Sequence, residues 1–248
     1  MIKLAHISTK APEKLSKKDV IEKTEEIVEK IGELSKLFQA ANDRALLIVL
    51  QGMDASGKDG TSREVFKFVS PTIVHAISFK KPSEDEMEHD FLWRVHPHTP
   101  GKGMIKVFNR SHYEDVLIQR VQGWINEEKV NNRFIAINHF EHNLVRDNQT
   151  TVLKFFLNIS REKQKEKLQE RIDDPQKNWK HNPDDWVQAE KWDVYQKCYE
   201  DVLNRSEIPW VVVPSDQTWY RNFVVAQKVM ETLLSFDQTY PLLKNITK

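Results

Sequence analysis

Five short apolar segments alternate with helical stretches, and this alternation limits the folds open to the chain more than any other feature. The segments are rich in Val, Ile, Leu and Phe, and they span residues 45–51, 72–79, 104–109, 151–159 and 210–214. Strands that are apolar on both faces and are separated by helices are typical of a parallel sheet covered on both sides. We therefore predict an α/β fold, a three-layer αβα sandwich built on a five-stranded parallel sheet.

The remaining segments predict helices and a simple division of the chain. Residues 16–41 carry apolar side chains at three- and four-residue spacing, after a loose N-terminal tail. We assign residues 1–42 to this tail and helix, 43–238 to the core and 239–248 to a C-terminal tail. Further helices are predicted over residues 83–93, 113–121, 127–145 and 219–234, and after Ser160 and Asn182.

Two of these helices intervene between the fourth and fifth strands, at about residues 160–205. An insertion at this place in an α/β enzyme is often a lid over the ligand-binding edge. Two surface helices without a special role explain the pattern equally well. Residues 160–205 are therefore a candidate helical lid within the core.

The first strand runs into the loop GMDASGKDG, which contains three of the 7 glycines in this 248-residue chain. Its spacing matches the Walker A pattern G-x-x-x-x-G-K, in which backbone amides and a helix N-terminus bind phosphates and the lysine reaches the outer ones. A strand-to-helix turn with a surface lysine is the alternative. We predict that the loop binds phosphate through Gly52, Met53, Ala55, Ser56, Gly57, Lys58, Asp59 and Gly60.

Asp54 lies inside this loop, and Asp59 occupies the place where a Walker A loop has a Ser or Thr that binds magnesium. A carboxylate beside phosphates is repulsive unless a cation lies between them. We therefore predict that Asp54 binds Mg²⁺. Asp59 is a weaker metal candidate that has helix capping as its alternative role.

Charged residues also follow the second and third strands. Residues just past the carboxyl end of a parallel strand face the site in open α/β sheets. Arg110 is predicted to neutralise phosphoryl charge, and Glu114 and Asp115 to bind Mg²⁺ or orient an acceptor, although a solvated helical turn explains the two acids nearly as well. Lys80 and Lys81 are phosphate-binding candidates, whereas Gly101-Lys-Gly103 is expected to be a turn at the opposite edge.

The helix after Ser160 carries Lys163, Lys167 and Arg171 as one basic stripe, which suits an anionic partner. Its adjoining stripe is acidic, with Glu162, Glu166 and Glu170, and neutralisation by these acids is the alternative reading. The nine histidines show no convincing metal-binding spacing.

Overall charge and hydropathy exclude several classes of protein. Lys+Arg and Asp+Glu number 37 each, so the basic groups must gather locally if they bind a polyanion. The longest apolar run, Ala45 to Leu50, is far shorter than the roughly 20 residues of a membrane-spanning helix. With a lone Cys198 and no signal-peptide pattern, we expect a cytoplasmic protein without nucleic-acid or membrane partners.

Taken in order, these segments resemble the family-2 polyphosphate kinases over about residues 15–236. The matching motifs are GMDASGKDG, SFKKP, FLWR, FNRSHYEDV, LKFFLNIS, DDPQKNWK and WYRN. The resemblance implies a P-loop kinase-like core with a helical lid that moves phosphoryl groups between inorganic polyphosphate and nucleotides. It implies catalytic roles for Asp54, Lys58, Arg110 and Arg171, and it adds Arg94, Lys177 and Lys180 as phosphate- or nucleotide-binding residues.

The third-strand motif resembles one branch of that family. Asn109 stands where the commoner branch has an aspartate, and His112-Tyr113-Glu114-Asp115 is similar to the branch that phosphorylates both nucleoside monophosphates and diphosphates. The resemblance implies a reversible, Mg²⁺-dependent transfer from polyphosphate to AMP and ADP, forming ADP and ATP, in a homodimer or homotetramer. The alternatives are an ATP-dependent nucleoside monophosphate kinase and a non-catalytic polyphosphate- or nucleotide-binding module.

Overall fold

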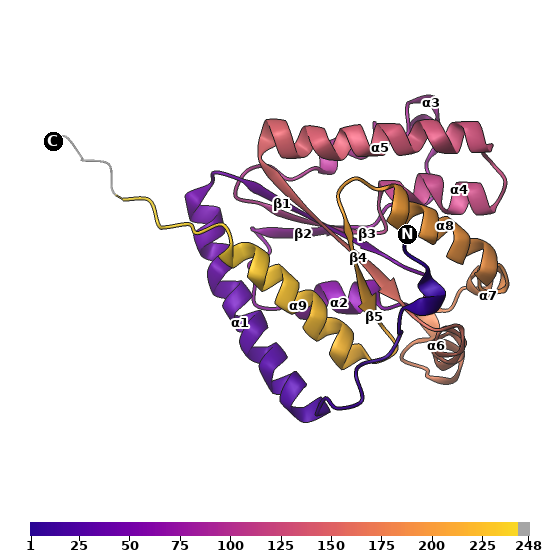
Figure 1. Ribbon diagram of the computed structural model, residues 1–248, viewed down its shortest axis with the longest axis horizontal. Coiled ribbons are helices and arrows are strands. Elements are labelled where there is room, and N and C mark those ends of the chain that lie inside the picture. Colours follow the sequence, from indigo (N-terminus) through magenta and orange to yellow (C-terminus); the bar gives the residue numbers. More distant parts are fainter. Residues whose placement is uncertain (243–248) are drawn as a thin grey trace.

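The predicted strands form a single parallel sheet in the computed structural model, which describes residues 1–242 (Figure 1). Its order is β2–β3–β1–β4–β5, with β1 pairing with β3 on one side and with β4 on the other. The carboxyl end of β1 is therefore the point where successive connections diverge, which is where ligands bind in such sheets. The strands are β1 (Ala45–Gln51), β2 (Val74–Ile77), β3 (Ile105–Asn109), β4 (Thr150–Asn158) and β5 (Trp210–Pro214).

Helices cover both faces of the sheet, so the predicted αβα sandwich is confirmed (Figure 1). One face packs against α1 (Lys17–Ala41), α2 (Lys58–Val65) and α9 (Thr218–Leu234). The other packs against α5 (Glu127–Asn148) and α8 (Trp192–Arg205), next to the short α4 (Ile118–Val121).

The apolar side chains of β1 pack in both of these cores. Leu47 and Val49 point into the core beneath α5 and α8, whereas Leu46, Ile48 and Leu50 point into the core beneath α1 and α9. Successive strand residues alternate between faces. A strand covered on both sides must therefore be continuously apolar, which explains its sequence.

Four of the predicted helix starts agree with the structure and have a side-chain cap. The Ser16 and Ser160 hydroxyls accept hydrogen bonds from the amides of Asp19 and Lys163. Ser83 and Glu86 form the expected capping box of α3 (Glu84–Glu88). Asn182 caps α7 (Pro183–Glu190), as predicted.

Several predicted boundaries were wrong. The helix expected over 83–93 ends at Glu88, where Asp90 instead accepts a hydrogen bond from the Leu92 amide and favours a turn. The strand expected over 72–79 spans only Val74–Ile77, because this edge strand has β3 as its single partner. The helix expected over 113–121 is divided into a 3₁₀-helix (His112–Val116) and α4.

The N-terminal residues are not the loose tail that the sequence predicted. A 3₁₀-helix (Leu4–His6) buries Leu4 in the core beside α8. The Leu4 amide donates to Glu200 on α8, and the Thr9 hydroxyl donates to Asp216 after β5. Contacts with residues some 200 positions away in the sequence hold this segment, and no local pattern announces them.

The insertion between β4 and β5 has two parts with different surroundings. α6 (Arg161–Asp173), a 3₁₀-helix (Asn178–Lys180) and α7 pack mainly on one another and lie beside the sheet's carboxyl edge (Figure 1). α8 instead buries Tyr195, Tyr199 and Val202 in the core. The projecting part of the candidate lid therefore ends near residue 190, and its role as a lid stays a prediction.

Residues 239–242 follow α9 as exposed chain, and the rest of the C-terminal tail expected at 239–248 lies outside the described residues. Within residues 1–242, none of the helices combines the length and the apolar character needed to cross a membrane.

Candidate active site

The predicted phosphate loop joins β1 to α2, and its backbone needs glycine at two positions. Gly57 precedes the first residue of α2, Lys58, with φ at 99°, and a Cβ there would collide with the guanidinium of Arg221. A Cβ at Gly52 would lie 2.7 Å from the carbonyl oxygen of Leu157. These close approaches explain why a glycine-poor chain places glycines in this loop.

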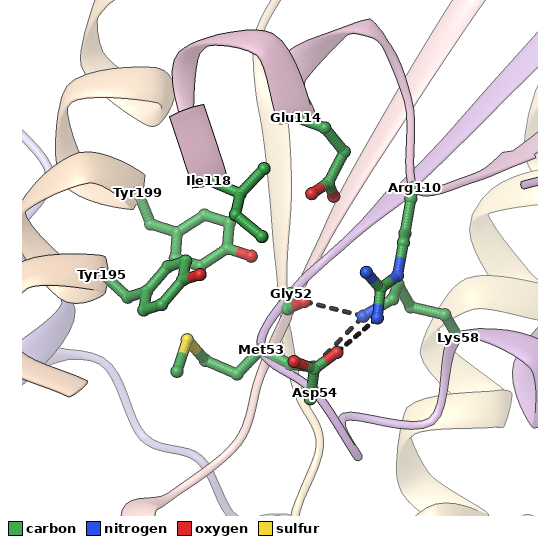
Figure 2. Close-up of a pocket in the computed structure, with 9 residues that line it drawn as sticks. All are labelled: Gly52, Met53, Asp54, Lys58, Arg110, Glu114, Ile118, Tyr195 and Tyr199. Carbon is green, nitrogen blue, oxygen red and sulfur yellow. Dashed lines mark hydrogen bonds and ion pairs between the residues drawn. The ribbon is translucent and has the colours of Figure 1, made fainter. Parts of the chain in front are cut away.

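Asp54 and Arg110 form an ion pair across the loop, with Arg110 Nη2 2.5 Å from Asp54 Oδ1 (Figure 2). The residue after Asp54, Ala55, and Arg110 itself both have φ at 63°, in the left-handed region. Such a conformation costs on the order of 1–3 kcal/mol at a non-glycine residue. The surrounding fold therefore imposes the backbone geometry that brings this carboxylate and guanidinium together.

Lys58 extends back along the loop. Its Nζ donates to the carbonyl oxygens of Gly52 at 2.7 Å and Met53 at 3.1 Å. Burial and the neighbouring Arg110 lower the pKa of Lys58, against the carboxylates of Asp54 and Glu114, which raise it. The lysine is thus held at the mouth of the loop beside the Asp54–Arg110 pair.

Glu114 faces the same group of charges from the 3₁₀-helix His112–Val116. Figure 2 shows its carboxylate pointing toward Arg110 and the loop, with Tyr195 and Tyr199 of α8 forming the opposite wall. Burial raises the pKa of Glu114, whereas Arg110 and Lys58 lower it. The structure therefore brings together the predicted residues Asp54, Lys58, Arg110 and Glu114.

The carboxylates at this point fit a magnesium ion that is shared with a phosphate ligand. Mg²⁺ is usually bound through one or two carboxylates together with substrate phosphates. Asp54 and Glu114 both line the small cavity at the loop. Residues 1–242 contain no cluster of three or more His, Cys, Asp or Glu side chains that would bind a metal on its own.

A cationic cavity of about 710 Å³ extends from the phosphate loop to α6 and the segment after it. The acids that line it are Asp54, Asp59 and Glu170. The cations outnumber them: Lys58, Lys80, Arg110, Lys167, Arg171, Lys177, Lys180 and Arg221. This excess of positive charge in a concave site favours an anion with several charges.

The basic stripe on α6 is partly neutralised, but not only by the acidic stripe beside it. Lys163 pairs with Glu166, whereas Arg171 pairs at 2.5 Å with Asp185 on α7. Lys167 makes no ion pair with a carboxylate in the part of the chain that the structure describes. Burial, reinforced by the positive charges of Arg221 and Lys163, lowers the pKa of Lys167 to about 8.

The predicted residues Lys177 and Lys180 differ in their partners. Lys177 pairs with Glu170 and Asp174, whereas Lys180 lies over the ring of Trp179. Asp59, the weaker metal candidate, accepts a hydrogen bond from Asn109 and does not cap α2.

A second large cavity, of about 580 Å³, is lined by other predicted residues, and we call it the second cavity. Asp115 is buried there, where it accepts hydrogen bonds from Arg94 at 3.3 Å and Gln119 at 2.5 Å. Burial raises the pKa of Asp115, and the charges of Arg94 and Arg133 lower it. The apolar part of the wall comes from Met87, Phe91, Trp124 and Ile125.

These positions separate two pairs of neighbouring predicted residues. Asp115 lies in the second cavity and not beside Asp54, so the arrangement does not support one metal shared by these two residues. Glu114, its neighbour in the sequence, occupies the place at the loop instead. Lys80 and Lys81 are also separated, with Lys80 in the cationic cavity and Lys81 in the second one.

Sequence reasoning missed Arg221, which supports the phosphate loop from behind. Arg221 is 2% exposed, and its guanidinium donates to the Ser56 carbonyl and the Thr61 hydroxyl behind the phosphate loop. Burial alone lowers the pKa of Arg221 to about 10, and no carboxylate within residues 1–242 pairs with it. The motif WYRN contains this arginine and was the one signal available.

Comparisons with known proteins agree over nearly the whole chain. The sequence model of the family described as Polyphosphate kinase 2 (PPK2) matches residues 14–240. An AMP/ADP-polyphosphate phosphotransferase of Meiothermus ruber is 43% identical over 215 residues, which cover 86% of this chain and 80% of the relative. An ADP-polyphosphate phosphotransferase of Rhodopseudomonas palustris is 39% identical over 229 residues, covering 86% and 79%.

The fold agrees with a solved structure as well. The crystal structure of polyphosphate kinase 2 from Arthrobacter aurescens TC1 superposes with a TM-score of 0.94 at 35% sequence identity. The match covers 98% of this chain and 89% of that one. The match therefore includes the strands and helices that line the cavities, and not the phosphate loop alone.

Proposed function

This chain belongs to the polyphosphate kinase 2 family, and on that basis we propose that it transfers phosphoryl groups reversibly from inorganic polyphosphate to AMP and ADP, forming ADP and ATP. The observation that carries the proposal is the cationic cavity that continues from the phosphate loop to α6. A donor of many linked phosphates needs such an extended row of positive charges, whereas a single nucleotide triphosphate does not.

The donor is assigned to the cationic cavity. The loop amides and Lys58 are positioned for the reacting phosphate, and Lys167, Arg171 and Lys180 for phosphates farther along the polymer. Arg110 lines both the small cavity at the loop and the cationic cavity, where it neutralises charge on the phosphoryl group in transfer.

The acceptor nucleotide is assigned to the second cavity. Its apolar wall, with Trp124 and Phe91, suits a nucleobase, and Lys81, Arg94 and Arg133 supply positive charge for the acceptor phosphate. Glu114 lines the small cavity at the phosphate loop, which shares Asp54, Lys58 and Arg110 with the cationic cavity, and its neighbour Asp115 lines the second cavity. The donor and acceptor sites therefore meet at the 3₁₀-helix His112–Val116.

The chemistry needs positioning and charge neutralisation more than a general base. The acceptor phosphate is already an anionic nucleophile, so its oxygen attacks without losing a proton to the protein. Asp54 and Glu114 are the residues that would hold Mg²⁺, which supplies charge neutralisation on the donor phosphates when it is bound. Lys58 and Arg110 stabilise the negative charge on the transferring group, and Tyr195 and Tyr199 restrict the access of water to it.

We also propose that the chain assembles as a dimer or tetramer. The resemblance to family-2 polyphosphate kinases is the basis of this proposal, and apolar side chains that stay exposed in one copy, such as Phe68 at 47% and Val145 at 38%, are available for burial in such an assembly. Light scattering on the protein as it leaves a size-exclusion column gives its mass directly. A mass of 29.2 kDa, that of one chain, at micromolar concentration would contradict the assembly.

One assay tests the proposed reaction. The purified protein is incubated with Mg²⁺ and either AMP or ADP, with polyphosphate or ATP as the donor. We expect ADP and ATP to form with polyphosphate as the donor. Phosphorylation of AMP by ATP without polyphosphate would favour a nucleoside monophosphate kinase. Tight polyphosphate binding without turnover would favour a binding module.

A further inference from the structure

A buried ion pair lies in the core beneath the 3₁₀-helix His112–Val116, outside both cavities. Lys154 of β4 and Glu141 of α5 are fully buried, and Lys154 Nζ lies 2.6 Å from Glu141 Oε2. Removing two charges from water costs several kcal/mol per ion, and replacing such a pair with apolar residues often leaves a protein equally or more stable. Stability alone is therefore a weak explanation for these two residues.

The pair is hydrogen-bonded to two consecutive residues of the 3₁₀-helix. The Tyr113 hydroxyl donates to Glu141 Oε1 at 3.0 Å and accepts from Lys154 Nζ at 2.7 Å. His112 Nε2 lies 3.2 Å from the same Glu141 oxygen. Burial raises the pKa of Glu141, but His112 and Lys154 lower it by more, so the net pKa lies below its usual value and the carboxylate is ionised. Because an ionised carboxylate only accepts hydrogen bonds, the His112 ring nitrogen is the donor.

The next two residues of this helix face different cavities. Glu114 points into the small cavity at the phosphate loop, and Asp115 points into the second cavity toward Arg94. A 3₁₀-helix has three residues per turn, so consecutive side chains differ in direction by about 120°. Asp115, three residues after His112, therefore lies on the same side of the helix as His112, and Glu114 is turned about 120° from Tyr113. Fixing His112 and Tyr113 thus also determines the directions of Glu114 and Asp115.

We propose that the buried Lys154–Glu141 pair positions the reaction site: through His112 and Tyr113 it sets the rotation of the 3₁₀-helix and thereby holds Glu114 at the donor and Asp115 at the acceptor. The pair acts without touching either substrate, so both residues are positioning residues. This inference rests on the proposed function, because it assigns the two cavities to donor and acceptor.

An apolar anchor would not set this rotation in the same way. The hydroxyl of Tyr113 has partners from α5 and β4, and hydrogen bonds are directional to within tens of degrees, whereas apolar packing is not. A shift of about 1 Å at a catalytic group can reduce turnover about 100-fold. The gain in turnover from a precise anchor therefore explains why the chain buries two charges here although their burial is destabilising.

The first test separates positioning from stability by the double variant Lys154→Met with Glu141→Leu. Removing both charges leaves no unpaired buried ion, which offsets the loss of the hydrogen bonds to His112 and Tyr113, so we expect a folded protein with a melting temperature within several degrees of the wild type. We also expect kcat with polyphosphate and AMP to fall at least about 10-fold. A folded double variant with wild-type kinetic constants would overturn the inference.

A second, smaller change keeps the test decisive if the double variant does not fold. Tyr113→Phe removes one hydroxyl and keeps the ring. Ser35→Ala is its matched control, because Ser35 on α1 is also fully buried and loses one hydrogen bond, to the Gly32 carbonyl, on the opposite face of the sheet. Tyr113→Phe should lower the melting temperature more than Ser35→Ala, because the Tyr113 hydroxyl has three hydrogen-bond partners, Glu141, Lys154 and Ser206, and the Ser35 hydroxyl has one; both variants should stay folded at the assay temperature. Only Tyr113→Phe should lower kcat and raise the KM for AMP, each by a few-fold or more, and equal kinetics of the two variants would overturn the inference.

The conservative variant Glu141→Gln supplies a rescue, since it keeps an oxygen that accepts from Tyr113 and His112, and it should retain more activity than Glu141→Leu. A wild-type protein without polyphosphate-dependent turnover would overturn the proposed function and this inference with it. Wild-type turnover that none of the variants alters would overturn the inference alone.

Discussion

Arg110 Nη2 and Asp54 Oδ1 lie 2.5 Å apart, and this ion pair links the carboxyl end of β3 to the phosphate loop after β1. The two side chains are half-buried, so each charge is partly screened by water and partly by the other. A phosphate attracts Arg110, and a cation bound to that phosphate attracts Asp54. We infer that a bound donor separates this ion pair. Arg110 then pairs with a donor phosphate, and Asp54 pairs with the cation on that phosphate.

The first prediction concerns Asp54. We expect Asp54→Asn to reduce Mg²⁺-dependent turnover by about 100-fold or more, because the amide cannot balance the charge of a metal ion at the loop. The fold should be retained, because the Asp54 side chain is partly exposed and anchors no buried element. Steady-state rates over a range of Mg²⁺ concentrations measure the effect.

Asp147→Asn is the control for this change, because Asp147 is an exposed residue at the far end of α5 and lines neither cavity. It should behave like the wild type. Near-normal turnover of Asp54→Asn would remove Asp54 from the mechanism.

The second prediction compares two glycines. Gly57→Ala places a Cβ against the Arg221 guanidinium at a residue with φ of 99°, so it should displace the arginine or the loop. We expect a loss of stability of roughly 1–3 kcal/mol and a large loss of activity. Gly101→Ala should have neither effect, because no atom lies within 4 Å of the added Cβ. Melting temperatures and kcat of the two variants decide, and full activity of Gly57→Ala would show that the loop tolerates the change.

The third prediction tests the assignment of the donor. Lys167→Gln removes a cation that faces the cationic cavity, so the KM for polyphosphate should rise about 10-fold, as expected for one charge-assisted contact, and the KM for AMP should stay the same. Lys165→Gln removes an exposed lysine from the same helix and should leave both constants unchanged. The difference between the variants should shrink in high salt, since salt screens the charge. Equal KM values would place the polymer elsewhere.

The fourth prediction follows from the pKa of Lys167, about 8, which burial and the nearby Arg221 and Lys163 lower from 10.5. Lys167 loses its charge as the pH rises through this value, so the KM for polyphosphate should increase between about pH 7 and pH 9. Lys167→Arg keeps its charge in this range and should flatten the increase. An identical pH dependence of the wild type and Lys167→Arg would exclude Lys167 as its cause.

Unfolding does not explain that pH dependence. The pKa of Lys167 is lower in the folded than in the unfolded protein, so the unfolded protein binds more protons between the two values. The contribution of this residue to stability therefore improves as the pH rises through this interval. Melting temperatures at the same pH values check that the protein stays folded.

The fifth prediction tests the assignment of the acceptor. Trp124→Ala removes a half-exposed aromatic ring from the second cavity, so the KM for AMP should rise several-fold while the KM for polyphosphate stays the same. Ile135→Ala removes an equally exposed apolar side chain that lines neither cavity, and its kinetics should match those of the wild type. A rise in the KM for polyphosphate instead would reverse the assignment of the two cavities.

The amino-acid sequence by itself determined the sheet and the phosphate loop. Continuous apolar strands report burial on both faces, helix caps act within four residues, and Gly52 and Gly57 mark close approaches of the backbone. These signals are local, so they can be read along the chain. Their agreement is also the reason that the αβα architecture and the strand–loop–helix arrangement around GMDASGKDG were predicted correctly.

Only the tertiary structure decided which cavity each of two neighbouring residues faces. Glu114 and Asp115, like Lys80 and Lys81, differ by one position in the sequence and face different cavities. Their directions depend on anchors such as Glu141, which is about 30 residues away, and Arg221 reaches the loop from 165 residues away. Directional contacts between distant segments determine where a side chain points, and a local pattern carries no record of them.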